Sequence, residues 1–282
     1  MHLYRYFGSH ALETLRDNRL MLAMPSTLND PFEFLYRSTG EMTLAKARAF
    51  FKRSKKSDNF CAELRKKYPA IKNKKDCKRH IEENLESMAQ EYLKSYSSVT
   101  KVKPQFCYDL GDKTFRIACF SSPDVEAHEE ILMWSHYASK HSGVRIKFDV
   151  NENSKWPYWV KKVNYEKERV GLDFTNGADD DSVKKGLIQA ISTKAAGWKY
   201  EREYRMFWLP SDCRDETDEN SVTRSFIKFD PKLVVGIDFG IKCPDKTIKE
   251  VMVVVNEKYK GIEVRRAVHH QSSFAIDYVS MN

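Results

Sequence analysis

The sequence predicts an α+β fold in which a mixed or antiparallel β core carries an inserted basic helical subdomain. Short aromatic and apolar segments with strand composition recur before residue 40 and again after residue 115. Between residues 43 and 103 the chain is instead rich in Lys, Glu and Leu and nearly free of Gly, which favours helices. We therefore interpret residues 1–282 as one elaborated domain with a helical insertion at 43–103.

The first 40 residues predict a strand, a short helix, a second strand and a turn. Leu3–Phe7 has strand composition, and Ser9 is placed to cap a helix over His10–Arg19. Leu20–Met24 is a second apolar run. Asn29–Glu33 predicts a tight turn, although its polar side chains would also suit a sugar or a metal.

The inserted segment predicts two or three helices, with breaks at 54–59 and 69–73. The positions expected to be buried are apolar or aromatic: Phe50, Phe51, Leu64, Ile81, Leu85, Met88, Tyr92 and Leu93.

The net charge of +8 is concentrated in this insertion. Residues Lys46–Lys103 include 17 Lys and Arg against 7 Asp and Glu, a local charge of +10. This segment is therefore the expected contact for a nucleic acid or another polyanion. A solvated helix face is the alternative interpretation of the same residues.

The second half of the chain alternates helices and strands before ending in β-rich structure. Helices are expected over Glu129–Ala138 and Val183–Ala196, an acidic loop over Asn176–Ser182, and a polar loop over Asp212–Ser221. The expected strands are Phe115–Phe120, Val144–Val150, Lys161–Tyr165, Phe226–Phe229, Val234–Phe239, Val251–Val255 and Ile262–Ala267.

Several protein classes are disfavoured by the composition. No run approaches the ~20 apolar residues of a membrane span, and the N-terminus lacks a signal-peptide core. The six cysteines are scattered, so we expect reduced thiols in a cytoplasmic protein. The tandem His269-His270 has no third ligand at a suitable spacing, so no metal site is expected. Neither a dinucleotide-binding glycine motif nor a P-loop occurs.

The most informative stretch is Trp198–Arg205, where Glu201 and Glu203 lie two residues apart. Its aromatic and apolar content favours a strand, on which both carboxylates would point to the same face. Two like charges held close together raise the pKa of at least one, which suits acid–base chemistry or stabilisation of a cation. The alternative is an edge strand whose charges face water, with Arg202 and Arg205 pairing nearby.

Two groups could converge with these carboxylates on one site, Arg5 on the first strand and Ser121 at a strand end, while His136 belongs to a second cluster on the helix that follows. An Arg is suited to hold a phosphate, and an anion is suited to stabilise a developing positive charge. His136 could act as a general base, or it could be a structural histidine packed against the core.

The order Arg, Ser, Glu-x-Glu resembles the signature of ADP-ribosyltransferases, which use NAD as a substrate. The resemblance implies that Arg5 binds the NAD phosphates and ribose, that Ser121 braces Glu203, and that Glu203 stabilises the ribosyl cation. It also implies that Glu201 orients or deprotonates the acceptor. Aromatic side chains near such a site, Tyr6 or Tyr137, could stack on nicotinamide. The serine motif here is Phe-Ser-Ser where the family has Ser-Thr-Ser.

A second resemblance covers nearly the whole chain outside the insertion. The chain resembles a bacterial and phage-associated family of unknown function, whose members occur near phage-defence genes. It is carried by the segments Leu3–Tyr6, Leu28–Glu33, Cys119–Ser121, Met133–Ala138 with His141 and Gly143, and Trp198–Arg205.

Three functions remain open on the sequence alone. The first is an NAD-dependent ADP-ribosyltransferase-like enzyme that modifies a macromolecular acceptor in a bacterial defence or toxin context. The second is a nucleic-acid-binding effector or nuclease that uses the Lys46–Lys103 helices with His136, Glu201 and Glu203. The third is a non-catalytic defence sensor or partner-binding domain.

Overall fold

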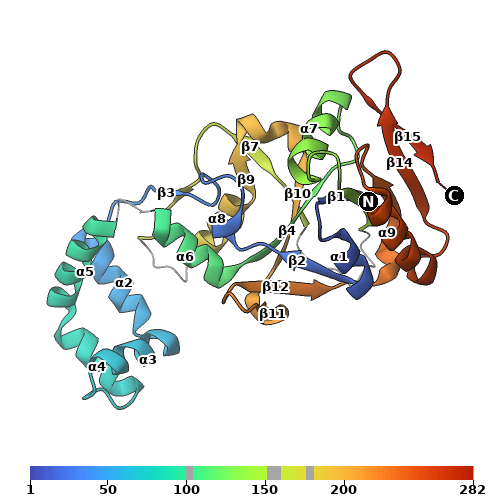
Figure 1. Ribbon diagram of the computed structural model, residues 1–282. Helices are drawn as coiled ribbons and strands as arrows, with labels where there is room; N and C mark the ends of the chain where they lie inside the picture. The colour runs from blue at the N-terminus through green and yellow to red at the C-terminus, as the bar shows by residue number, and fades with distance from the viewer. Residues whose placement is uncertain (100–103, 151–159, 176–180, 282) are drawn as a thin grey trace. The chain divides into compact units, whose positions relative to one another are not determined.

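A computed structural model of the protein describes residues 1–99, 104–150, 160–175 and 181–281 (Figure 1). The predicted acidic loop falls largely outside these residues, as do the last lysines of the predicted basic segment. By their internal contacts, the residues form two compact units. The first, which we call the sheet unit, comprises Met1–Glu33, Asp109–Lys167 and Ser192–Asn282, and the second, the helical unit, comprises Phe34–Tyr108 and Glu168–Ile191.

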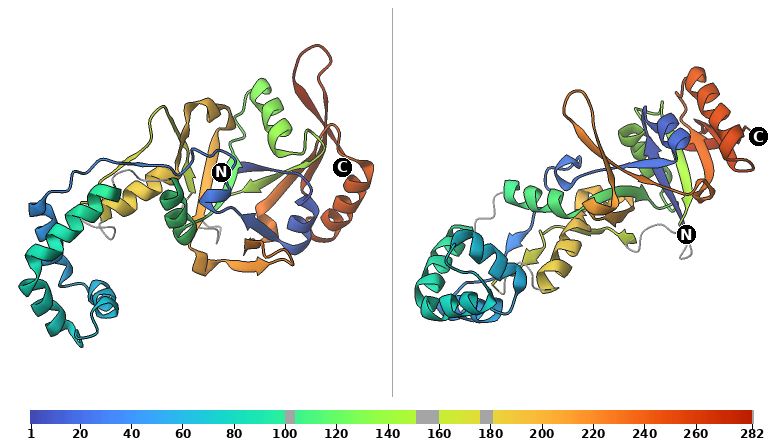
Figure 2. Two further views of the ribbon diagram at one scale, coloured as in Figure 1. Left: turned by 60° about the vertical axis from the view of Figure 1, so that its left-hand side comes forward. Right: turned by 90° about the horizontal axis from the view of Figure 1, so that it is seen from below.

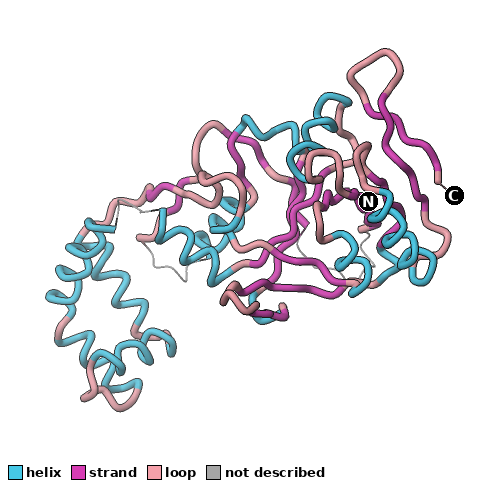
Figure 3. The backbone as a smooth tube through the Cα atoms, viewed as in Figure 1, coloured by secondary structure: helices cyan, strands magenta, loops and turns pink. Residues whose placement is uncertain are grey.

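The sheet unit is built on an eight-stranded mixed sheet with the order β15-β14-β13-β5-β1-β4-β10-β6. Strands are drawn in magenta in Figure 3. Among the strands that the structure describes in this sheet, only β13 and β14 pair in parallel. The α+β class with a mixed sheet is therefore confirmed. The strands are β1 (His2–Phe7), β4 (Arg116–Ser121), β5 (Val144–Asp149), β6 (Val160–Lys162), β10 (Glu203–Trp208), β13 (Val234–Phe239), β14 (Glu263–His269) and β15 (Ile276–Ser280).

Helices α1 (Ala11–Asp17) and α9 (Asp245–Lys258) pack against each other and close the main core (Figure 2). Tyr259, which caps the end of α9, donates its hydroxyl proton toward the Leu15 carbonyl oxygen at 2.8 Å. The strand predicted at Val251–Val255 is wrong, because this segment lies within α9. Its β-branched residues resemble a strand, but the buried side chains recur at the helical spacing 248, 251, 254 and 255.

Strands β1 and β4 diverge in the middle of the sheet. β1 pairs with β5 at six positions and β4 pairs with β10 at six, but β1 and β4 share only the pair Tyr4 and Ser121. Ala23, just after β2 (Arg19–Leu22), instead forms a bridge with Ile117 on β4, with N–O distances of 2.8 and 2.9 Å. The sheet is thus split near its centre, and the side chains on both sides of the split are available to line a cavity.

The remaining elements of the sheet unit surround this core. Helix α7 (Ala127–Tyr137) follows β4. It is tied to β15 because Trp134 Nε1 donates to Tyr278 Oη at 3.0 Å and that hydroxyl donates to Glu130 at 2.7 Å. The other elements are β2, β11 (Arg214–Thr217) and β12 (Thr223–Lys228) in a three-stranded sheet, the pair β7 (Asn164–Glu166) and β9 (Thr193–Ala195), and the short helices η1 (Pro25–Thr27), η2 (Ala196–Glu201), η3 (Pro210–Asp212) and η4 (Pro231–Leu233).

Three predicted boundaries need correction. The residue that precedes α1 is His10 rather than Ser9, and no side chain caps this helix. The helix predicted over Val183–Ala196 ends at Ile191, and the residues that follow form β9 and η2. The predicted polar loop at 212–221 contains β11, which is exposed and so lacks the apolar alternation of a half-buried strand.

The helical unit contains the inserted segment. The described part of the insertion forms four helices, α2 to α5, where two or three were expected. The breaks between α2, α3 and α4 fall where the sequence placed them, but the break at Asn84 between α4 and α5 was not predicted. Every position expected to be buried contributes to one apolar cluster. Cys61 and Cys77 are joined in a disulfide between α3 and α4, which corrects the expectation of six reduced thiols. The elements are α2 (Leu44–Ser54), α3 (Asp58–Lys67), α4 (Lys74–Glu83), α5 (Leu85–Val99), α8 (Asp181–Ile191) and the paired strands β3 (Arg37–Ser38) and β8 (Gly171–Leu172), while α6 (Pro104–Thr114) has residues in both units.

Candidate functional site

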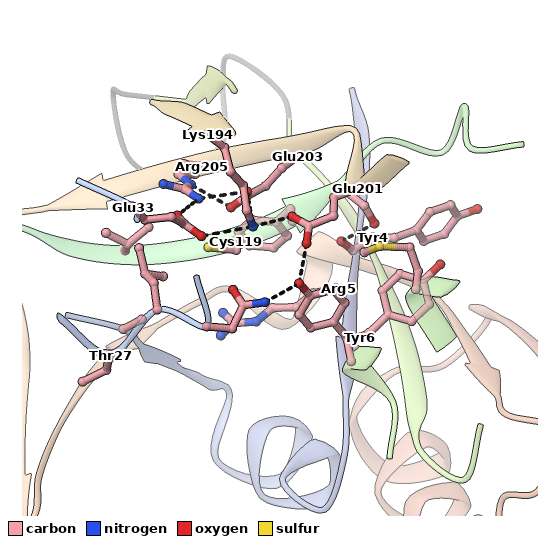
Figure 4. A pocket seen from close by; sticks show the side chains of 18 residues that line it. Tyr4, Arg5, Tyr6, Thr27, Glu33, Cys119, Lys194, Glu201, Glu203 and Arg205 are labelled. Atoms are coloured by element: carbon pink, nitrogen blue, oxygen red, sulfur yellow. Dashed lines mark hydrogen bonds and ion pairs between the residues drawn. The ribbon is translucent and has the colours of Figure 1, made fainter. Parts of the chain in front are cut away.

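A cavity of about 250 Å³ opens in the sheet unit where β1 and β4 diverge (Figure 4). Its walls come from β1, β4, the last turn of α7, the end of η2, the start of β10 and the segment from Ala23 to Glu33. We call it the site cavity. Six of the seven site residues predicted from sequence line it: Arg5, Tyr6, Ser121, Tyr137, Glu201 and Glu203.

Arg5 presents a cation that no carboxylate of the described chain neutralises. Its Nη2 donates to the Met21 carbonyl oxygen at 2.8 Å, while its Nη1 is buried and has no hydrogen-bond partner in the parts of the chain that are described. The guanidinium lies 5.3 Å from the Phe7 ring centroid and 5.7 Å from that of Phe120. Burial lowers the pKa of Arg5 to about 10. A desolvated cation of this kind favours an anionic ligand.

A buried cluster of charges forms another wall of the site cavity. Lys194 on β9 places its Nζ 2.6 Å from Glu201 Oε2, 3.1 Å from Glu33 Oε1 and 3.5 Å from Glu203 Oε2. Arg205 on β10 donates to both oxygens of Glu203, at 2.7 and 2.9 Å, and also to Glu33. All five side chains are at most 5% exposed. Three carboxylates thus face two cations away from water.

The two glutamates of the Glu-x-Glu motif have pKa values that move in opposite directions. Burial opposes ionisation of Glu203, but the charge and hydrogen bonds of Arg205 outweigh it and lower the pKa of Glu203 to about 2. Burial raises the pKa of Glu201, and Glu203 adds to the rise, whereas Lys194 partly offsets it. The expectation that one carboxylate would have a raised pKa is therefore confirmed. Glu203 stays an anion, and Glu201 is the group suited to exchange a proton.

The motif does not lie on a single strand, which corrects the sequence interpretation. Glu201 ends η2, and only Glu203 begins β10. Arg202 between them has a left-handed backbone with φ of 44°, so the alternation of a strand does not apply. The edge-strand alternative is also wrong, because β10 lies between β4 and β6 with Glu203 buried. Both carboxylates reach the site cavity because the kink at Arg202 turns them toward Lys194.

The other predicted residues lie in different environments. Ser121 is paired with Glu203 in the sheet register, yet its hydroxyl donates to the Tyr4 carbonyl oxygen at 3.4 Å, and Arg205 supplies the brace expected from the serine. The Tyr6 hydroxyl accepts a hydrogen bond from Arg145 Nη1 at 3.2 Å, which holds the Tyr6 side chain in place.

His136 does not join the predicted site. It is exposed in the last turn of α7 and is absent from the lining of the site cavity. Its ring centroid lies 6.3 Å from that of Tyr200. The general-base role that we assigned to it therefore has no support from its position.

Lys194 was missed by the sequence interpretation. The segment around it reads as the end of a helix, and a lone lysine gives no sign that it will be buried. Glu33 and Asn29 belong to the turn whose polar side chains were noted, and both line the site cavity. Only the fold brings them next to the Glu-x-Glu motif.

The basic residues of the helical unit are partly neutralised by acidic neighbours. The N–O distances are 2.6 Å for Lys55 and Glu82, 2.7 Å for Lys74 and Asp58, and 2.8 Å for Arg48 and Glu86. Exposed pairs of this kind are typical of a solvated helix face. Binding of a nucleic acid by this segment stays a prediction.

Comparison with known proteins adds one match. The model of the family described as "Protein of unknown function (DUF2971)" matches residues 133–206, which include the end of α7 with Tyr137 and the Glu-x-Glu motif. This agrees with the resemblance to an uncharacterised family. No curated protein and no solved structure matched the chain. Within the described residues, the helices are too short or too polar to cross a membrane.

Proposed function

We propose that the site cavity binds NAD and that the protein transfers ADP-ribose to a macromolecular acceptor. The observation that carries this proposal is that a buried cation and two carboxylates line the same cavity. Arg5 offers a desolvated cation that has no counter-ion among the described residues, and Glu201 and Glu203 offer carboxylates with different pKa values. A pyrophosphate suits the cation, and a sugar that develops positive charge suits the anion.

The chemistry assigns a separate role to each group. Arg5 would hold the pyrophosphate. Glu203 has a pKa of about 2 and so stays ionised at neutral pH, where it would stabilise the oxocarbenium-like ribosyl cation as nicotinamide leaves. The acceptor then bonds to the same carbon and loses a proton. Glu201 would take that proton, because its raised pKa makes it the better base near neutral pH.

The acceptor and the biological setting are part of the proposal. A nucleic-acid acceptor would be drawn by the basic residues of the helical unit, and a protein acceptor would not need them. The resemblance to families found near phage-defence genes favours a role as a bacterial defence or toxin enzyme. A sensor without turnover would bind ligand in the same cavity but would release no nicotinamide.

Labelled NAD tests the proposal directly. The wild-type protein, Glu203→Gln and Glu201→Gln are incubated with NAD and mixed protein, RNA and DNA acceptors, and both label transfer and nicotinamide release are measured. The exposed Glu219→Gln serves as the matched control. We expect Glu203→Gln to lose both activities and Glu201→Gln to lose transfer while keeping slow nicotinamide release. No NAD consumption by wild type with any acceptor would reject the proposal.

A further inference from the structure

Segments far apart in the chain meet around the carboxylate of Glu201. Asn29, which follows η1, donates its side-chain NH to Tyr137 Oη at 2.8 Å. Tyr137, the last residue of α7, donates its hydroxyl proton to Glu201 Oε1. Lys194 on β9 donates to Glu201 Oε2 at 2.6 Å (Figure 4). The result is a hydrogen-bonded chain from Asn29 through Tyr137 and Glu201 to Lys194.

The donors fix the direction of each hydrogen bond in this series. The amide nitrogen of Asn29 and the ammonium of Lys194 can only donate, so Tyr137 must give its single proton to Glu201. Burial, followed by the nearby charge of Glu201, raises the pKa of Tyr137, which keeps that proton on the phenol. Each oxygen of Glu201 therefore already accepts a donor from the protein.

The two donors occupy one lone pair on each oxygen of Glu201, and Tyr137 Oη offers a hydrogen-bonded path from the cavity to this carboxylate. Glu201 is 4% exposed, whereas Tyr137 is half-buried and lines the site cavity. Lys194 has no lone pair with which to pass a proton. The tyrosine hydroxyl can accept one proton while it gives up another, so it is the member of the chain able to connect the cavity with the base.

We propose that Tyr137 is a catalytic residue that relays the proton of the acceptor to Glu201. This inference rests on the proposed function. As the acceptor bonds to the ribosyl carbon, the carbon–nitrogen bond to nicotinamide breaks and nicotinamide leaves with the electron pair. The acceptor proton moves to Tyr137 Oη while the original proton of Tyr137 moves to Glu201 Oε1. The tyrosine ends unchanged, and Glu201 ends protonated.

The titratable groups facing Glu201 come from five elements: Lys194 on β9, Glu203 on β10, Tyr137 on α7, Tyr200 within η2 and Tyr165 on β7. Removing the Tyr137 hydroxyl takes away a hydrogen bond that stabilises the charged form of Glu201. The pKa of Glu201 must then rise further. Tyr200 offers a matched control, because it adjoins Glu201 in the sequence and Glu201 accepts its hydrogen bonds from other residues.

Two measurements on Tyr137→Phe separate the relay from the proposed function. The first is NMR of the ligand-free protein with ¹³Cζ-labelled tyrosine, in which the Tyr137→Phe spectrum identifies the Tyr137 signal. We expect this signal to shift with pH as Glu201 titrates, and to lose that shift in Glu201→Gln. The second is the rate of ADP-ribose transfer against pH. We expect Tyr137→Phe to lower kcat about 10²- to 10⁴-fold, to leave KM for NAD unchanged and to move the acidic limb to higher pH.

The outcomes distinguish the two proposals. A pH-independent Tyr137 signal in wild type, or a Tyr137→Phe variant with the wild-type rate and pH profile, would overturn the relay. If the NMR titration shows the coupling but wild type consumes no NAD, the hydrogen-bonded chain stands and the proposed function fails. Loss of activity in Tyr200→Phe equal to that in Tyr137→Phe would show a general structural effect and also overturn the relay.

Discussion

Replacing Lys194 with methionine is expected to destabilise the sheet unit strongly. The ammonium group lies within 3.5 Å of oxygens on Glu33, Glu201 and Glu203, and all four side chains are at most 5% exposed. Methionine keeps much of the side-chain volume but leaves three buried carboxylates with Arg205 as their remaining cation within the described cluster. Removing one partner of a buried ion pair costs about 3–5 kcal/mol, so we expect a loss of that size in the free energy of unfolding.

Urea denaturation at pH 7, followed by tryptophan fluorescence, measures this loss. The exposed Lys199→Met on the neighbouring η2 is the control and should change stability by less than about 0.5 kcal/mol. Adding Glu201→Gln to Lys194→Met should recover part of the loss, because the neutral amide removes one uncompensated charge. A cost below about 1 kcal/mol for Lys194→Met, or no recovery in the double variant, would refute the reasoning.

Three further predictions concern stability. The pKa of Glu203 falls from 4.5 to about 2 on folding, so the ionised carboxylate stabilises the folded protein above pH 4.5. This stabilisation is lost as the pH falls toward 2. Over this pH range the free energy of unfolding of wild type should fall by about 3 kcal/mol through Glu203, and that of Glu203→Gln should fall less. Equal dependence of the two on pH would contradict this. Arg5→Met should stabilise the ligand-free protein by about 1 kcal/mol, because it removes a desolvated cation; destabilisation in urea would contradict this. Tyr278→Phe should lower the free energy of unfolding by about 1–3 kcal/mol, because Trp134 Nε1 loses its hydrogen-bond acceptor and Glu130 loses a hydrogen-bond donor. An equal loss in Tyr200→Phe would contradict this prediction.

The parts of the fold with strong local patterns could be predicted from the sequence. The alternating segment at Val144–Val150 forms β5, and the helix expected at Glu129–Ala138 is α7, shifted by one or two residues. Two of the breaks between the inserted helices were also found, because Ser57 and Asn73 cap the helices that follow. The break at Asn84, between α4 and α5, was missed. Local sequence failed at Val251–Val255, where packing of one helix face outweighs the preference of valine for strands.

The site was only partly predictable for a different reason. Arg5, Glu201 and Glu203 have side chains whose chemistry points to a role, and the cavity contains all three. Lys194 acquires its importance only when the strand β9 carries it between three carboxylates. The left-handed Arg202, which directs Glu201 and Glu203 to one cavity, leaves no pattern in a sequence that otherwise resembles a continuous strand.

Calorimetric titration of ADP-ribose into wild type and Arg5→Met tests the central claim most directly. A charge-assisted hydrogen bond contributes about 1.5–3 kcal/mol, so Arg5→Met should weaken binding roughly 10- to 150-fold. The exposed Arg214→Met is the control and should bind like wild type. Binding by wild type that is weakened to this extent in Arg5→Met is the predicted result. Equal affinity of wild type and Arg5→Met, or no binding by wild type at millimolar ADP-ribose, would contradict the assignment of the site cavity to a pyrophosphate ligand.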